Sequence, residues 1–143
     1  MCARFKFTVP DQFTKGQKSL FESPAKEIEA RPGSAVPAVT SKGTCFIGIW
    51  NGFARIETLN KTWLSKGWKP VKIINGTSFK ERDTVGGTKE LKTFDIQKGQ
   101  SIGAIARVTY DGMGKKYVEI KMVTQPAEGK VKDVHHRMPK FIR

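Results

Sequence analysis

Short segments in which apolar and polar side chains alternate dominate the hydrophobic pattern of this chain. Residues 3–9 follow the pattern most strictly, with Ala3, Phe5, Phe7 and Val9 on one face and Arg4, Lys6 and Thr8 on the other. A two-residue period is typical of a strand with one buried face. Further apolar-rich segments predict strands at 35–39, 44–50, 71–74, 101–109 and 116–124.

Two short helices are expected between these strands. Ser23-Pro24 resembles an N-cap followed by proline at the first helical position, which predicts a helix over residues 25–30. A second brief helix ends at Gly67, because glycine readily adopts the left-handed conformation that terminates helices. The apolar face of this second helix consists of Leu59, Trp63 and Leu64.

Turn residues then set the expected order of the strands. Asn75-Gly76 is a strong hairpin signal after the strand at 71–74, and Val85-Gly86-Gly87 marks another turn. Residues 111–114 join the last two long strands. The pattern therefore predicts an α+β fold in one compact domain over residues 1–143, with a curved, mostly antiparallel sheet and a few short helices.

The charge of the chain indicates a polyanionic partner. Lys and Arg number 26 against 13 Asp and Glu, which gives a formal net charge of +13, and aromatic residues make up 10%. Such a field attracts nucleic acid, and aromatic rings can stack on exposed bases. A basic protein without a specific nucleic-acid partner is the alternative, since net charge alone sets only non-specific binding.

No segment approaches the roughly 18 consecutive apolar residues of a membrane span, and the first residues lack the apolar core of a signal peptide. We therefore expect a cytoplasmic, nucleoid-associated monomer, of a size that suits a phage genome. Cys2 and Cys45 form no CxxC pattern, so neither a metal site nor a disulfide is expected. We expect no cofactor. Cys45 lies in an apolar run and is assigned to the core.

Cys2 is the most reactive candidate. Removal of Met1 would leave an α-amine and a thiol on one residue, with pKa values of about 7.7–8.0 and about 8.5. Such a 1,2-aminothiol condenses with an aldehyde to a Schiff base, and the thiol then closes a thiazolidine ring. The chance occurrence of cysteine at position 2 is the alternative.

Three separated segments together resemble the SOS-response-associated peptidase (SRAP) family, whose members crosslink to abasic sites in single-stranded DNA. The three segments span nearly the whole chain, but few residues between them match the family. The segments are MCARF at 1–5, FARIET at 53–58 and VHHRMP at 134–139, similar to the family's MCGRF, NAR-x-ET and IHDRMP.

The resemblance implies a barrel-like fold and a catalytic set. Cys2 becomes the N-terminal nucleophile and His135 the acid–base group, while Phe53 stands where the family has its asparagine. Asn51 is then the substitute amide. Counting from Gly76 puts Phe79 at the position of the family's catalytic glutamate. Glu81 lies two residues further along and is the candidate for that role, because a two-residue step in a strand returns to the same face.

The resemblance also implies contacts to DNA. Arg4 and Arg55 correspond to the family's phosphate-contacting arginines, and guanidinium groups suit phosphodiesters. We add Arg137 to them. Lys61 would extend the basic surface, and Trp63 or Trp68 would stack on a base. Core packing is the alternative for Trp63, because it shares helical spacing with Leu59.

The expected function is therefore binding of single-stranded DNA and covalent capture of abasic sites through Cys2, which shields the lesion as part of a DNA damage response. Two alternatives remain open. One is a non-catalytic single-stranded nucleic-acid-binding protein on the same fold, and the other is an N-terminal-cysteine peptidase acting on its own leader. Whether the chain is an enzyme is therefore left open.

Overall fold

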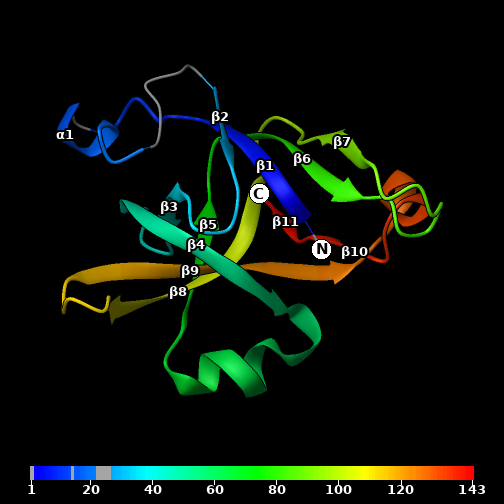
Figure 1. Cartoon of the computed structure of the whole chain (residues 1–143). Helices are drawn as coiled ribbons and strands as arrows, with labels where there is room; N and C mark the ends of the chain where they lie inside the picture. The colour runs from blue at the N-terminus through cyan, green and yellow to red at the C-terminus, as the bar shows by residue number, and fades with distance from the viewer. Residues whose placement is uncertain (1, 14, 22–26) are drawn as a thin grey trace.

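The computed structural model describes residues 2–13, 15–21 and 27–143, and it confirms the α+β class (Figure 1). Two sheets contain the strands. The four-stranded sheet has the order β2 (Glu27–Ala30), β1 (Cys2–Thr8), β6 (Gly76–Arg82), β7 (Leu91–Asp95). The seven-stranded sheet has the order β10 (Arg137–Pro139), β9 (Lys116–Pro126), β4 (Cys45–Arg55), β3 (Ala35–Thr40), β5 (Lys69–Ile73), β8 (Ser101–Tyr110), β11 (Phe141–Ile142).

The larger sheet curves into a ring. Strand β8 also pairs with β9, so that β9, β4, β3, β5 and β8 close on one another. Among the pairings of the described strands, β4 with β9 is parallel and the others are antiparallel. The expectation of a curved, mostly antiparallel, barrel-like sheet is confirmed.

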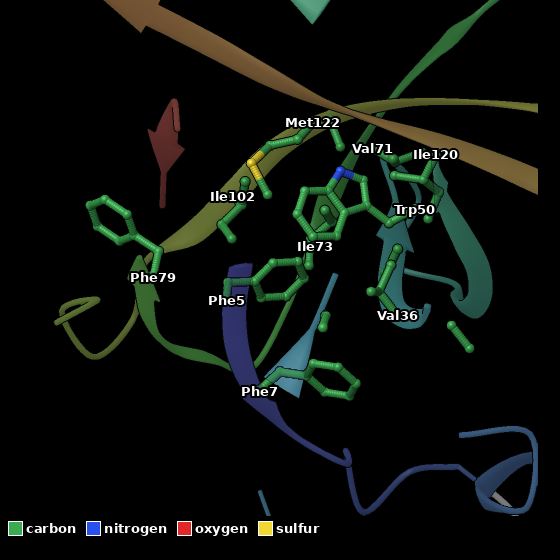
Figure 2. Packing of buried hydrophobic residues seen from close by; sticks show 14 of the residues in the cluster. Phe5, Phe7, Val36, Trp50, Val71, Ile73, Phe79, Ile102, Ile120 and Met122 are labelled. Atoms are coloured by element: carbon green, nitrogen blue, oxygen red, sulfur yellow. The ribbon is translucent and has the colours of Figure 1, made fainter. Parts of the chain in front are cut away.

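The main core lies between the two sheets (Figure 2). Phe5 and Phe7 point from β1 into this core, and the ring of Phe5 lies 5.1 Å from that of Trp50 on β4. The polar residues that alternate with them, Arg4 and Lys6, are only partly buried. The two-residue period of the first strand is therefore confirmed, because burying one face of β1 removes large aromatic surfaces from water.

Short helices connect the strands. Helix α1 covers Lys15–Lys18, and η4 covers Gly129–Asp133. The expected helix around Trp63 is confirmed as three successive short helical segments, the 3₁₀ turn η1 (Ile56–Thr58), the π turn η2 (Leu59–Trp63) and the 3₁₀ turn η3 (Leu64–Lys66). It ends at Gly67, whose φ of 92° is in the left-handed region. These turns cover the outer face of the ring, where Leu59, Trp63 and Leu64 pack on a second core of Ala54, Trp68, Ile105 and Val123.

The expected helix over residues 25–30 is wrong where the structure describes it. Ser23-Pro24 lies outside the described residues, but Glu27–Ala30 forms strand β2 and pairs with β1. Ile28 and Ala30 are buried and Glu27 is exposed, which is a strand alternation. Pairing with an existing strand outweighs a weak local helix preference.

The hairpin expected at Asn75-Gly76 is also wrong. Asn75 does adopt a left-handed φ of 62°, yet the flanking strands β5 and β6 belong to different sheets. The turn therefore carries the chain from one sheet to the other. By contrast, the turn near Val85 joins the paired strands β6 and β7, and residues 111–114 join β8 and β9, as expected. Within the described ranges, no helix has the length and apolar character needed to cross a bilayer.

Candidate functional site

The start of β1, the end of β6 and the segment leading into β10 meet at one end of the molecule (Figure 1). Cys2, whose backbone the structure describes, is paired with Glu81 of the antiparallel neighbour β6. The next pair is Arg4 with Lys80, so β1 contains one extra residue between the two pairs. This bulge interrupts the strict alternation of β1 at its first residue and sets Cys2 opposite a carboxyl group.

Glu81 is fully buried on the inward face of β6, as is Phe79 two residues earlier. Burial disfavours the charged carboxylate and raises the pKa of Glu81 to about 7. A carboxyl group with this pKa exists in both protonation states at neutral pH. Glu81 can therefore accept or donate a proton there.

His135 is also buried, with 8% of its surface exposed. Its Nδ1 accepts a hydrogen bond of 3.0 Å from the backbone N–H of Arg137, and its ring stacks on that of His136 with centroids 4.5 Å apart. Burial disfavours the charged imidazolium and lowers the pKa of His135. The lowered pKa favours the neutral imidazole at pH 7. The carbonyl oxygen of Arg137 also lies 3.2 Å from Nδ1, so the partner of this nitrogen depends on the tautomer.

Backbone hydrogen bonds connect the histidine segment to the end of β6. The carbonyl oxygen of Val134 accepts hydrogen bonds from the N–H groups of Thr84 at 2.9 Å and Val85 at 3.1 Å. The fold thus brings together three of the four expected catalytic positions, Cys2, Glu81 and His135.

The structure does not bring Asn51 to this group. Asn51 is exposed, and its Nδ2 donates a 2.6 Å hydrogen bond to Oε2 of Glu119. Glu119 in turn accepts a 3.2 Å ion-pair contact from Nε of Arg107. The neighbouring Trp50 points into the main core instead. Strand β4 does contain a one-residue bulge between Trp50 and Phe53, but it leaves the amide of Asn51 bound to Glu119 and not facing the core.

Aromatic residues occupy the two positions where the SRAP resemblance places polar groups. Phe53 packs edge-on against Trp50 at 5.7 Å, and Phe79 stacks on Phe94 at 5.3 Å. Phe79 also contacts Phe141 at 5.4 Å. Both therefore contribute to the main core, and Glu81 provides the carboxyl group at the end of β6.

The three arginines differ in their surroundings. Arg4 is half-exposed and forms a 3.1 Å ion pair with Glu29, which Lys80 also contacts. Arg55 is exposed at the end of β4, where it is the cross-strand neighbour of Thr124. Arg55 therefore has the accessible position that a phosphate contact requires.

Arg137 is a correction to the expected DNA contacts. It is 4% exposed, and its guanidinium group binds the Glu57 carboxylate through two hydrogen bonds of 2.6 and 3.0 Å. A guanidinium group that lies beneath the surface and is bound to Glu57 and Thr124 is not available to a phosphodiester. Arg137 is therefore a structural group in this fold.

Trp68 is a second correction, because it is only 3% exposed and belongs to the core beneath η2 and η3. It has no free face for a base. Trp63 is half-buried against the same core and meets Trp68 edge-on at 5.5 Å, which agrees with the core-packing alternative. Lys61 is exposed on the same helical segment.

Two basic residues beside these tryptophans were missed by the sequence analysis. The guanidinium carbon of Arg107 lies 4.6 Å from the Trp68 ring, and Nζ of Lys121 lies 5.4 Å from the Trp63 ring. Both are cation–π distances. No local sequence signal could reveal them, since they come from β8 and β9, far along the chain from the tryptophans.

Cys45 lies at the edge of the main core rather than within it. It is half-buried and accepts a 3.3 Å hydrogen bond from Nε2 of Gln12 at its Sγ. In the part of the chain that the structure describes, no three His, Cys, Asp or Glu side chains form a group that could hold a metal ion.

Comparisons with known proteins identify the fold but no family. No protein-family model matches the chain, and no curated protein matches it significantly. A crystal structure of a protein from Bordetella bronchiseptica is similar, with a TM-score of 0.72 and 17% identity over 99% of this chain and 84% of that one. A second, from Bacteroides thetaiotaomicron, has a TM-score of 0.74 and 14% identity over 97% of this chain and 77% of that one.

Proposed function

We propose that this protein binds single-stranded DNA and captures abasic sites covalently through Cys2 after removal of Met1. The observation that carries the proposal is the pairing of Cys2 with Glu81, a buried carboxyl group whose pKa is raised to about 7. His135 lies at the same end of the molecule, and this set of groups provides a nucleophile position beside a carboxyl group that can transfer protons and a buried imidazole.

The proposed reaction joins the two molecules with loss of one water. The α-amine nitrogen of Cys2 attacks the C1′ aldehyde of the ring-opened deoxyribose, and a C–N bond forms. The resulting hydroxyl group takes a proton and leaves as water, which gives a Schiff base. The thiol sulfur then adds to the same carbon, the nitrogen receives the thiol proton, and the thiazolidine ring closes. Glu81 supplies the proton to the leaving hydroxyl group.

Capture requires that the DNA strand reach this end of the molecule. The net charge of +13 attracts the phosphate backbone over a distance set by the ionic strength. Arg55 is exposed at the end of β4, on the same side as the segment that contains Arg137. Lys61, Lys121 and Arg107 form a second basic region around Trp63 and Trp68.

The test is a crosslinking assay with single-stranded DNA that contains one abasic site, analysed on a denaturing gel. We expect wild type to give a shifted band, and Cys2→Ala to give none. Cys45→Ala is the matched control and should retain the band, because an internal cysteine has no α-amine beside its thiol. Intact mass should show a chain without Met1. An equal band from Cys2→Ala would refute the proposal.

A non-catalytic nucleic-acid-binding protein is the second candidate, favoured by Phe53 in the core and by Asn51 bound to Glu119. It predicts the same affinity for intact and abasic single strands and no dependence on Cys2. Comparing the binding of the two strands by wild type and by Cys2→Ala, at one salt concentration, separates the two candidates.

A further inference from the structure

Arg137 links the surface carboxylate of Glu57 to the ring of His135. Its Nη1 contacts Oε2 of Glu57 at 2.6 Å and its Nη2 contacts Oε1 at 3.0 Å, a bidentate geometry. Nη2 also donates to the carbonyl oxygen of Thr124 at 2.8 Å and to its Oγ1 at 3.1 Å. The side chain is thus held from β9 and from η1, which are separated in the sequence.

The backbone of the same residue controls the histidine. The N–H of Arg137 donates to Nδ1 of His135 at 3.0 Å, while its carbonyl oxygen lies 3.2 Å from that nitrogen. The N–H can donate only to the lone pair of Nδ1, and a neutral ring that accepts there carries its proton on Nε2. The tautomer with its proton on Nδ1 would donate to the carbonyl oxygen instead, so the position of the Arg137 backbone sets the balance between the two tautomers.

We propose that Glu57 is a positioning residue, which holds the Arg137 backbone through the bidentate ion pair and thereby keeps His135 as a neutral donor with its proton on Nε2. This inference rests on the proposed function, because it concerns the same site. In that role His135 donates a hydrogen bond from Nε2 to the substrate oxygen and does not accept a proton there. Glu81 is then the group that transfers protons.

The two partners of the ion pair differ in burial, and this difference explains how the surface residue Glu57 can affect the position of the buried Arg137. The Arg137 side chain is 5% exposed and that of Glu57 is 46% exposed. Removing the carboxylate would leave a buried positive charge that keeps only its bonds to Thr124, and its Nε has no hydrogen-bond partner among the described residues. A buried guanidinium group without its counter-charge is costly, so Arg137 would move toward water and take β10 with it.

The experiment compares wild type, Glu57→Gln and Glu128→Gln. Glu128 is the matched control, since it is an exposed carboxylate at the start of η4 that contacts only Gln125 in the described structure, at 2.8 Å. Nitrogen-15 NMR of labelled histidine at pH 8 reports the tautomer of His135, and the rate of crosslinking to abasic single-stranded DNA is measured on the same samples. His135→Ala assigns the resonances.

We expect wild type and Glu128→Gln to show His135 protonated on Nε2. Glu57→Gln should show a mixture of tautomers and a crosslinking rate about tenfold lower, at unchanged affinity for intact DNA. Glu57→Asp keeps the charge and should recover part of the crosslinking rate. If circular dichroism shows that Glu57→Gln is unfolded, Glu57→Asp is compared with wild type in its place. An unchanged tautomer in Glu57→Gln, or a proton on Nδ1 in wild type, would overturn the inference. If wild type does not crosslink, the proposed function fails, while the NMR result still decides the positioning role.

Discussion

At the scale of single residues, Glu81 combines full burial with a pKa of about 7. Its position could be predicted from the sequence, because a two-residue offset from Phe79 keeps the same face of the strand. The raised pKa of Glu81 could not be predicted from the sequence, because the apolar residues that surround its carboxyl group come from several strands. The same contrast holds for Asn51, whose partner Glu119 is 68 residues away in the sequence.

Glu81→Gln should change the pH dependence of stability. The folded-state pKa of about 7 lies above the ordinary value of 4.5, so the folded state binds the proton more tightly. The stabilisation is complete below pH 4.5 and is lost as the pH rises to about 7. Each pKa unit is worth about 1.4 kcal/mol, so the loss is on the order of 3 kcal/mol.

Urea unfolding of wild type and Glu81→Gln between pH 4.5 and 8 measures this effect. His135, whose lowered pKa acts in the opposite direction by losing stability as the pH falls, is common to both proteins. The free energy of unfolding of wild type should therefore fall relative to that of the variant as the pH rises. Parallel curves would show that Glu81 has an ordinary pKa.

At the scale of elements, the contact between β4 and β9 depends on a glycine. A Cβ atom added at Gly48 would overlap Cδ1 of Ile120 and lie 2.7 Å from its Cγ1, and it would be 3.3 Å from the carbonyl oxygen of Val118. Ile120 is fully buried and cannot swing away. The two strands can therefore pair in parallel register only because position 48 carries no side chain.

Gly48→Ala should accordingly destabilise the fold by about 1–3 kcal/mol, the range for overpacking a core. Gly112→Ala is the control, because an added Cβ there meets nothing within 4 Å and needs no positive φ. We expect that change to stay within about 0.5 kcal/mol of wild type. Chemical denaturation of both variants measures their free energies of unfolding. Equal stabilities would mean that the contact between β4 and β9 accommodates a methyl group at position 48 without cost.

Elements also show where local sequence patterns are insufficient. The alternation of Phe5 and Phe7 was enough to predict β1, because a strand with one buried face has a period that no helix shares. Residues 27–30 are too few for a period to be decisive, and pairing with β1 determined their conformation. Asn75-Gly76 predicted a turn correctly, but which strands meet across a turn depends on the whole sheet.

At the scale of the whole molecule, the net charge of +13 should make the binding of single-stranded DNA strongly dependent on salt. In a Cys2→Ala background, which prevents capture, log K should fall linearly with log salt. Lys61 and Lys66 are exposed on η2 and η3. Replacing both by Gln should reduce the slope by roughly 0.7 for each phosphate that the protein no longer neutralises.

Lys18→Gln provides the control for this measurement. Lys18 is an exposed lysine of α1, which lies far from η2 and η3 in Figure 1. It removes positive charge from a different surface and should leave the slope unchanged. Fluorescence anisotropy between about 50 and 300 mM salt is sufficient to compare the three proteins. An equal decrease of the slope in all variants would indicate that the positive charge of the whole protein attracts the DNA, and that η2 and η3 do not form a specific binding surface.

By itself, the sequence determined the class of the fold, the inward face of β1, the brief helix that ends at Gly67 and the positive charge, because each depends on residue type and short-range period. Only the tertiary structure decided which groups lie together. It placed Cys2 opposite Glu81, brought the His135 segment to the end of β6 and buried Arg137 and Trp68, since burial and pairing arise from segments distant in the chain. The same long-range packing sets the protonation of Glu81 and His135, on which the proposed chemistry depends.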